Sequence, residues 1–315
     1  MNKLSLVVIH VFFGELPPWF SLFQMSCCAN PEIQFLFFLD SKTQIKKCSN
    51  IRTILFSKEN FSALTTRKLG KKIELIQSYK LCDFKPMFGK IFDDYIRDYE
   101  YWAHCDNDLI FGNISKYLKQ ELKDKLDILS FYKGFISGPF CIYRNNNLVN
   151  TLYSQGLNID NVLKSELYCG FDENIYQALI KPVLINHIWV FMLYLFSSNC
   201  KYLFYGKEYR FQFQWFYKKK LNKKRYLLDI TDIVNRAVYK AELSVKFSEQ
   251  ILSDRKLFRL GYKDWKIHYK EHRLSLQESK DEIFIFHFID LKNELRSKYV
   301  FQGKKEYVIN KEGIE

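Results

Sequence analysis

The sequence predicts an α/β fold, a sandwich of helices around a mainly parallel central sheet. Three observations support this prediction. Segments 4–10 and 33–39 are continuously apolar, as strands covered on both faces are. A candidate helix separates them and another follows the third strand, and such alternation is typical of parallel sheets. The chain has 315 residues, 48% of them hydrophobic, so it can bury a large core.

The first seventy residues contain clear start and stop signals for helices. Pro17 and Pro18 favour a helix start, Ser57 can cap a second helix, and Gly70 can end it. The expected elements, in order, are a strand at Leu4–His10, a helix at Trp19–Cys28, strands at Ile33–Leu39 and Ile51–Phe56, and a helix over about 59–69.

The remaining elements are expected at shorter intervals. Apolar residues at helical spacing predict a helix within 79–96, with Pro86 in its first turn. After it we expect strands at Tyr99–Cys105, Asp127–Tyr132, Gly138–Arg144, near 225–230, near 264–270 and at Ile283–Ile289, with helices at about Ile114–Lys123 and Leu148–Gln155. No linker rich in Pro, Gly or Ser divides the chain, so we expect one domain: a core over 1–199 and a C-terminal elaboration over 200–315.

The charge balance favours anionic partners. The formal net charge is +13, and residues 218–225 (K-K-K-L-N-K-K-R) form a dense basic cluster. The cluster is either a solvated loop or a contact with an anionic surface.

Neither the cysteines nor the apolar runs predict export or a membrane span. The eight cysteines have no CxxC spacing, so we expect unpaired thiols in a reducing compartment, neither disulfides nor zinc ligands. We interpret the apolar N-terminus as a first core strand because it lacks a small-residue cleavage site. The run at 183–196 is shorter than a membrane span. We therefore expect a cytoplasmic protein, with peripheral contact at the inner membrane.

Two aspartates separated by one residue follow the expected strand that ends at Cys105. In an extended segment Asp106 and Asp108 would point to the same side, and their carboxylates could bind Mg²⁺ or Mn²⁺ together with phosphate oxygens. Asp and Asn are also common in turns, so the pair read alone favours a surface turn over a cation site.

The surrounding motifs favour the cation site. The sequence K-L-C-D-F-K-P-M-F-G at 80–89 precedes H-C-D-N-D at 104–108, and F-D-E follows at 171–173. In this order they resemble an uncharacterised family of bacterial polysaccharide-biosynthesis proteins. More broadly they resemble nucleotide-sugar-dependent glycosyltransferases of the GT-A class, which have a Rossmann-type α/β/α core. The resemblance covers roughly residues 4–180.

The resemblance implies roles for individual residues. Asp106 and Asp108 would bind the metal, and a late histidine, His287, would complete its shell. A histidine on an apolar strand is otherwise a core residue. The residues implied on the donor side are Asp40, Asp83, Lys85, Asp106 and Asn107. Lys85 would balance a phosphate or form an ion pair with Asp83 or Asp94.

Asp172 and Glu173 are candidates for the general base that deprotonates an acceptor hydroxyl. Acids at this position also suit the start of a helix, where the helix dipole favours negative charge. Residues 137–145 would form an acceptor wall, with Gly138 allowing close approach and Arg144 offering a charge, or would belong to the core.

Together these features predict a metal-dependent, hexosyltransferase-like enzyme. It would take a nucleotide sugar, a UDP-sugar first, with Mn²⁺ or Mg²⁺, and serve capsule or O-antigen (lipopolysaccharide) synthesis with a saccharide or lipid-linked acceptor. The alternatives are a basic nucleic-acid-binding or nucleic-acid-processing protein and a non-catalytic relative of the same fold. We expect no nucleic-acid partner, because the sequence lacks RNA-binding and helix-turn-helix signatures.

Overall fold

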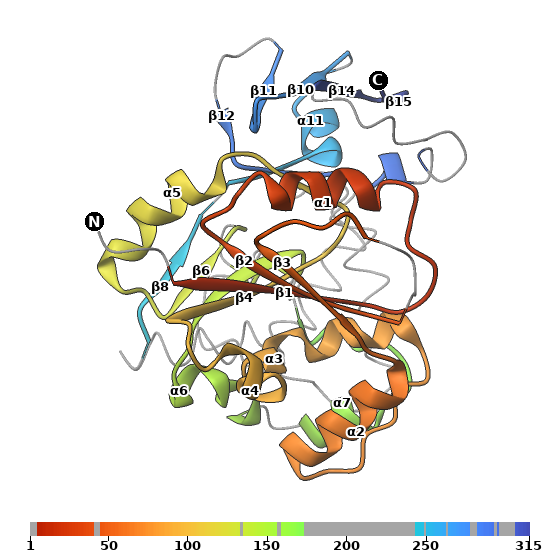
Figure 1. The fold of residues 1–315 in the computed structure, drawn as a ribbon, viewed down its shortest axis with the longest axis vertical. Coiled ribbons are helices and arrows are strands. Elements are labelled where there is room, and N and C mark those ends of the chain that lie inside the picture. Colours follow the sequence, from red (N-terminus) through yellow and green to blue (C-terminus); the bar gives the residue numbers. More distant parts are fainter. Residues whose placement is uncertain are drawn as a thin grey trace, which may run out of the picture.

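A seven-stranded sheet forms the centre of the molecule in the computed structural model (Figure 1). The structure describes residues 5–40, 45–132, 135–155, 159–172, 243–248, 250–262, 264–277, 282–292, 295 and 306–315. The strand order is β3-β2-β1-β4-β7-β6-β8, and β7 runs antiparallel to both of its neighbours. The strands are β1 (Leu6–Phe12), β2 (Gln34–Leu39), β3 (Ile51–Leu55), β4 (Tyr101–Cys105), β6 (Ile128–Ser130), β7 (Phe140–Arg144) and β8 (Val245–Phe247). The predicted α/β class with a mainly parallel sheet is confirmed.

Helices cover both faces of this sheet because its strands are apolar on both sides. Along β1, Val7, Ile9 and Val11 pack into the core below the sheet in Figure 1, whereas Leu6 and Val8 pack into the core above it. The upper layer consists of α1 (Phe20–Cys28) and α5 (Ile114–Glu121). The lower layer contains α2 (Lys58–Leu69), α3 (Phe88–Ile91), α4 (Asp93–Ile96), α6 (Asn147–Asn150) and α7 (Ile159–Lys164).

The caps of α2 behave as the sequence predicts. The Ser57 side chain accepts from the Asn60 backbone N–H, and the Asn60 side chain accepts in return from the Ser57 N–H. Gly70 ends the helix at φ +66°, a left-handed conformation that glycine adopts without a steric penalty.

The segment 79–96 differs from its prediction as a helix. It forms a 3₁₀ segment, Ser78–Met87, followed by the short turns α3 and α4. Pro86 lies inside the 3₁₀ segment and has no backbone N–H to donate, and Lys80 and Asp83 bond to residues more than eighty positions away. Because of these distant bonds and the missing donor, the segment does not form the continuous helix that its apolar spacing predicts.

Two smaller sheets are built mainly from the C-terminal part of the chain. Strands β5 (Leu109–Phe111), β13 (Ile285–His287) and β9 (Ile251–Ser253) pair side by side, and β9 leads into α11 (Asp254–Arg259). An antiparallel sheet lies above α1 and contains β10 (Lys266–Lys270), β11 (Arg273–Leu276), β12 (Glu282–Ile283), β14 (Glu306–Asn310) and β15 (Gly313–Ile314). The strand predicted at Ile283–Ile289 is interrupted at Phe284, and β14 and β15 follow it in the chain.

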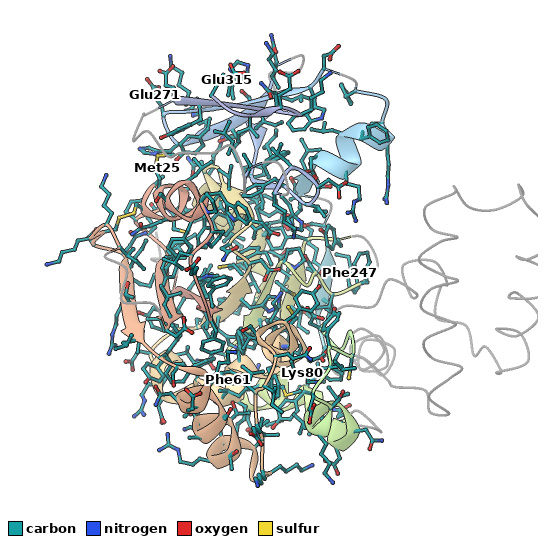
Figure 2. All side chains as sticks on the ribbon, turned by 90° about the vertical axis from the view of Figure 1, so that its right-hand side faces the viewer. Met25, Phe61, Lys80, Phe247, Glu271 and Glu315 are labelled. Carbon is teal, nitrogen blue, oxygen red and sulfur yellow. A yellow bond between two sulfur atoms is a disulfide. The ribbon has the colours of Figure 1, made fainter. Side chains whose placement is uncertain are left out.

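Figure 2 shows the resulting stack. Glu271 and Glu315 mark the C-terminal sheet at the top, Met25 the α1 layer below it, and Phe61 and Lys80 the layer at the bottom. In the described part of the chain, no helix combines the length and apolar character that crossing a bilayer requires.

The prediction that all cysteines are unpaired is wrong for two of them. Cys28, at the end of α1, forms a disulfide with Cys48, just before β3. β2 lies between them in sequence, and the chain then returns past the end of α1, where Asn50 donates to the Cys27 and Asn30 carbonyls. A pairing across twenty residues has no local spacing signal.

Candidate active site

A cavity of ≈1260 Å³ opens at the carboxyl end of the parallel strands. Glu15 follows β1 and Asp106 follows β4, and both line it. The far wall comes from the C-terminal part of the chain, with Ser253 and His287. Ligands of open α/β sheets bind at this edge, beyond the strand ends.

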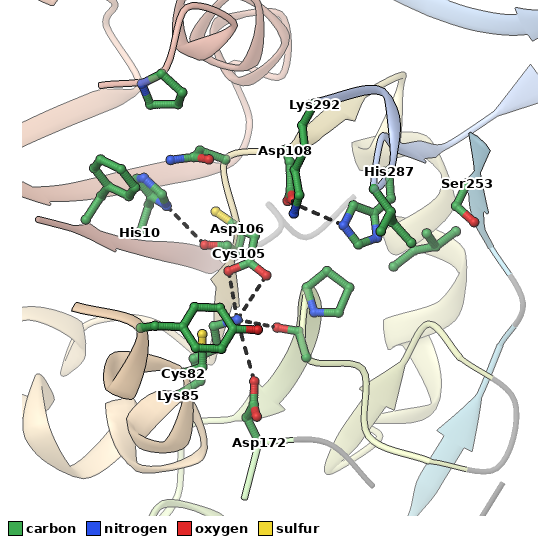
Figure 3. Close-up of a pocket in the computed structure, with 18 of the residues that line it drawn as sticks. His10, Cys82, Lys85, Cys105, Asp106, Asp108, Asp172, Ser253, His287 and Lys292 are labelled. Carbon is green, nitrogen blue, oxygen red and sulfur yellow. Dashed lines mark hydrogen bonds and ion pairs between the residues drawn. The ribbon is translucent and has the colours of Figure 1, made fainter. Parts of the chain in front are cut away.

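Lys85 lies at the centre of the charged groups in this pocket (Figure 3). Its Nζ is 2.7 Å from Asp106 Oδ1, 3.7 Å from Asp172 Oδ2 and 2.9 Å from the Gly138 carbonyl, to which it donates. Burial alone would lower the pKa of Lys85, but Asp106 above all, and Asp172 as well, raise it above its ordinary value. Lys85 is therefore a buried ammonium between two acids, and it pairs with neither Asp83 nor Asp94.

Asp108 faces a different set of partners. Its Oδ2 accepts from Lys292 Nζ at 2.9 Å, and its Oδ1 is 3.4 Å from His287 Nε2. Burial alone would raise the pKa of the Asp108 carboxyl, but His287 and Lys292 together lower it below its usual range. The other ring nitrogen of His287, Nδ1, lies 3.3 Å from the Tyr132 hydroxyl.

The two aspartates point to different partners because a bend, not a continuous strand, separates β4 from β5. Within the described residues, no three His, Cys, Asp or Glu side chains are grouped so that they could hold a metal ion. The donor types nevertheless suit a divalent cation. Asp108 Oδ1 is buried without a hydrogen bond to any described residue, and an imidazole nitrogen faces it. In this arrangement Lys85 and Lys292 hold the carboxylates that a cation would use.

Asp172 lies at the other side of Lys85 and is 3% exposed. The Tyr168 hydroxyl donates to its Oδ1 at 2.8 Å. Glu173, the second predicted base, lies outside the described residues, as do the basic cluster 218–225 and the apolar run 183–196.

Asp83 is fully buried and is not one of the residues that line the pocket. Its Oδ2 accepts from Lys80 Nζ at 2.8 Å and from the Cys169 N–H at 2.7 Å, and its Oδ1 accepts from the Phe171 N–H at 2.7 Å. Asp83 therefore anchors the segment that carries Asp172.

The remaining predicted residues divide between the pocket and its support. Asn107 lines the pocket, whereas Asp40 does not: its two carboxylate oxygens accept from the Gly14 N–H at 2.9 and 3.1 Å and so fix the loop after β1. Gly138 lines the pocket, as expected for an acceptor wall, but Arg144 lies at the opposite end of β7, with its nearest acid, Asp127, at 3.9 Å.

Several pocket residues were missed from the sequence. His10, on β1, donates from Nδ1 to the Cys105 carbonyl at 3.0 Å, and burial lowers its pKa to about 4. Lys292 is placed by Asp254, whose carboxylate accepts backbone N–H bonds from residues 289–291. Ser253, which caps α11, marks a helix start in the sequence. No local signal places that helix at the pocket. The basic residues missed at this wall are Arg255, Lys256, Arg259 and Lys292.

No curated protein matches the sequence. Among solved structures, the galactosyltransferase LgtC, in complex with donor and acceptor sugar analogues, is 9% identical with a TM-score of 0.38, over 90% of this chain and 86% of that one. The glycosyltransferase GlyE of Streptococcus pneumoniae TIGR4 is 15% identical with a TM-score of 0.30, over 77% of this chain and 65% of that one.

The family comparison covers nearly the whole chain. The model of a family of unknown function, DUF6625, matches residues 8–315. The chain therefore belongs to the DUF6625 family.

Proposed function

We propose that this protein is a glycosyltransferase that moves a sugar from a nucleotide-sugar donor to a saccharide or lipid-linked acceptor. One observation supports this above all: a large pocket at the carboxyl edge of a parallel sheet brings Asp106, Asp108 and Asp172 together with Lys85 and Lys292. Acids for a cation and a base, together with ammonium groups for phosphates, are the side chains that this transfer requires.

The donor diphosphate is assigned to the side of Asp106 and Asp108. There Asp106, Asp108 and His287, which are not grouped as a metal site in the described structure, would have to converge on Mn²⁺ or Mg²⁺. The cation would supply positive charge to the departing diphosphate. Lys85 and Lys292 already contact these carboxylates, so their ammonium groups lie where phosphate oxygens would approach. A UDP-sugar is the first donor to test.

Asp172 is assigned as the base. In the transfer, the acceptor hydroxyl oxygen bonds to the anomeric carbon of the donor and the bond from that carbon to the phosphate oxygen breaks. The electron pair of the broken bond stays on the diphosphate, and the hydroxyl proton passes to the Asp172 carboxylate. The Tyr168 hydroxyl fixes the rotamer of Asp172 through the bond to Oδ1.

A role in capsule or O-antigen assembly would bring the protein to a membrane surface with its acceptor. Phe258 on α11 and Leu260 just after it are 75% and 61% exposed, and they lie among Arg255, Lys256 and Arg259. All of these except Phe258 also line the rim of the pocket. Apolar and basic side chains together suit an anionic lipid surface. This patch is the described part of the chain that we assign to peripheral membrane contact.

Calorimetry with UDP, with and without Mn²⁺, tests the proposal. We expect UDP binding that strengthens at least about tenfold with Mn²⁺, because each tenfold step corresponds to 1.4 kcal/mol of charge compensation. Asp108→Asn keeps the shape of the side chain and should abolish the Mn²⁺ effect. Asp264→Asn is the matched control, since Asp264 is 81% exposed and pairs with Lys311 far from the pocket.

Two results would contradict the proposal. One is Mn²⁺-dependent UDP binding that Asp108→Asn leaves unchanged, which would refute the proposed cation site. The other is a screen in which no nucleotide sugar is bound or hydrolysed with Mn²⁺ or Mg²⁺, which would refute the proposed enzymatic activity. Salt-dependent binding of RNA or DNA would instead support the nucleic-acid alternative.

A further inference from the structure

Two tyrosines lie at the pocket next to Asp172. Tyr79 comes from the 3₁₀ segment Ser78–Met87 and is 67% exposed, whereas Tyr168 comes from the loop that Asp83 anchors. Both line the pocket, and their ring centroids are 4.9 Å apart with the planes at 70°. A large aromatic side chain that remains this exposed at a pocket is a candidate binding surface.

The tyrosine pair is joined directly to the proposed base. Tyr168 donates its hydroxyl hydrogen to Asp172 Oδ1, and the other carboxylate oxygen of Asp172 lies 3.7 Å from Lys85 Nζ. An aromatic face and a buried carboxylate therefore stand side by side. A pyranose ring matches both, because its C–H faces pack on aromatic rings and its hydroxyl groups donate to carboxylates.

This region is separate from the acids assigned to the donor. Figure 3 shows Asp106 and Asp172 on opposite sides of the Lys85 amino group. The cavity of ≈1260 Å³ also exceeds the roughly 300–1,000 Å³ that is usual for a single small ligand. A second ligand can therefore occupy the Asp172 side while a donor occupies the Asp106 side.

We propose that Tyr79 and Tyr168 form the acceptor subsite and hold a pyranose ring with one of its hydroxyls directed at Asp172. This inference rests on the proposed glycosyltransferase function and adds the chemical class of the acceptor end. A nucleobase also stacks on tyrosine. However, placing it here would bring the diphosphate that it carries towards the Asp172 carboxylate, so the saccharide is favoured.

Saturation-transfer NMR on the full chain, with UDP and Mn²⁺ present in excess, tests the subsite. The probes are the methyl pyranosides of glucose, galactose, mannose and N-acetylglucosamine. We expect transfer to the ring C–H protons of at least one probe. Tyr79→Ala should weaken its binding at least about fivefold, the effect of losing one aromatic contact. Tyr79→Phe keeps the ring and should retain binding.

Leu55→Ala serves as the control, because Leu55 is similarly exposed, at 64%, and does not line the pocket. The subsite is overturned if no probe receives saturation or if Tyr79→Ala binds as tightly as the wild type. It is also overturned if a glycoside bound to the wild type without UDP is displaced when UDP is added. Calorimetry of UDP on the same variants separates the two proposals. Tyr79→Ala should bind UDP with the affinity of the wild type. If the wild type itself binds no UDP, the proposed donor site is refuted and not the subsite.

Discussion

Removing the Asp83 carboxylate charge should be among the most damaging single changes in the described structure. Asp83→Asn leaves the Lys80 ammonium, which is 2% exposed, with a carbonyl and a thiol as its described contacts, 2.7 Å from Val162 O and 3.5 Å from Cys169 Sγ. Breaking a buried ion pair by neutralising one partner costs about 3–5 kcal/mol. Asp83 also accepts hydrogen bonds from the Cys169 and Phe171 N–H groups, and one of these would lose its acceptor in the variant, at a cost of about 1–3 kcal/mol.

Removing both charges isolates the electrostatic part of this loss. In the double variant Lys80→Met/Asp83→Asn no charge stays buried without a partner, although an N–H still lacks its acceptor. We therefore expect the double variant to be at least about 2 kcal/mol more stable than Asp83→Asn alone, because it no longer buries an unpaired ammonium.

Urea unfolding of the wild type, Asp83→Asn and the double variant, followed by tryptophan fluorescence, gives the free energies of unfolding. Asp160→Asn is the control, because the Lys71–Asp160 pair is exposed and its loss should leave the unfolding curve unchanged. A loss below about 1 kcal/mol in Asp83→Asn would refute the reasoning. So would a double variant that is no more stable than the single one.

Three further changes have defined outcomes. Burial lowers the pKa of His10 from 6.5 to about 4, so the unfolded chain binds the proton more readily than the folded one. The free energy of unfolding should therefore be highest above pH 6.5 and should fall by about 3 kcal/mol as the pH falls from 6.5 to 4. His10→Phe should flatten that part of the stability profile in urea titrations; an unchanged slope would contradict the assignment. Gly89→Ala would place a methyl carbon 2.6 Å from a buried indole ring and should cost about 1–3 kcal/mol in thermal or urea unfolding, whereas wild-type stability would show that the ring can move. Phe258→Ser/Leu260→Ser should weaken co-sedimentation with anionic vesicles about tenfold, while Leu55→Ser, at a site 64% exposed on β3, should not; equal effects would remove the membrane patch.

Local sequence signals predict those parts of the fold in which a residue's neighbours in sequence decide its environment. The apolar runs of β1 and β2 can only be covered strands, and Ser57 and Gly70 mark the ends of α2 through backbone bonds within one turn. The 3₁₀ segment at 78–87 was not predictable in this way, because bonds to residues 162, 169 and 171 hold it.

The candidate site follows the same division. Asp106 and Asp108 were identifiable because they follow an apolar strand. Lys85 was predicted at the site but not as the partner of Asp106, and Lys292 was not predicted. Lys292 reaches Asp108 across 184 positions of sequence, and Lys85 reaches Asp106 from a segment whose apolar period indicates a continuous helix. The sequence therefore predicts the carboxylates and leaves unpredicted which cations neutralise them.

The contact between Asp108 and Lys292 has a consequence for protein synthesis. The ribosome adds about 5–20 residues per second, so Lys292 emerges roughly 10–40 s after Asp108. During that interval the β1–β4 region can already pair, because its strands all lie before residue 106. The nascent chain thus carries an acidic pocket edge whose second wall has not been made, and the proposed donor site is incomplete until translation has passed Lys292.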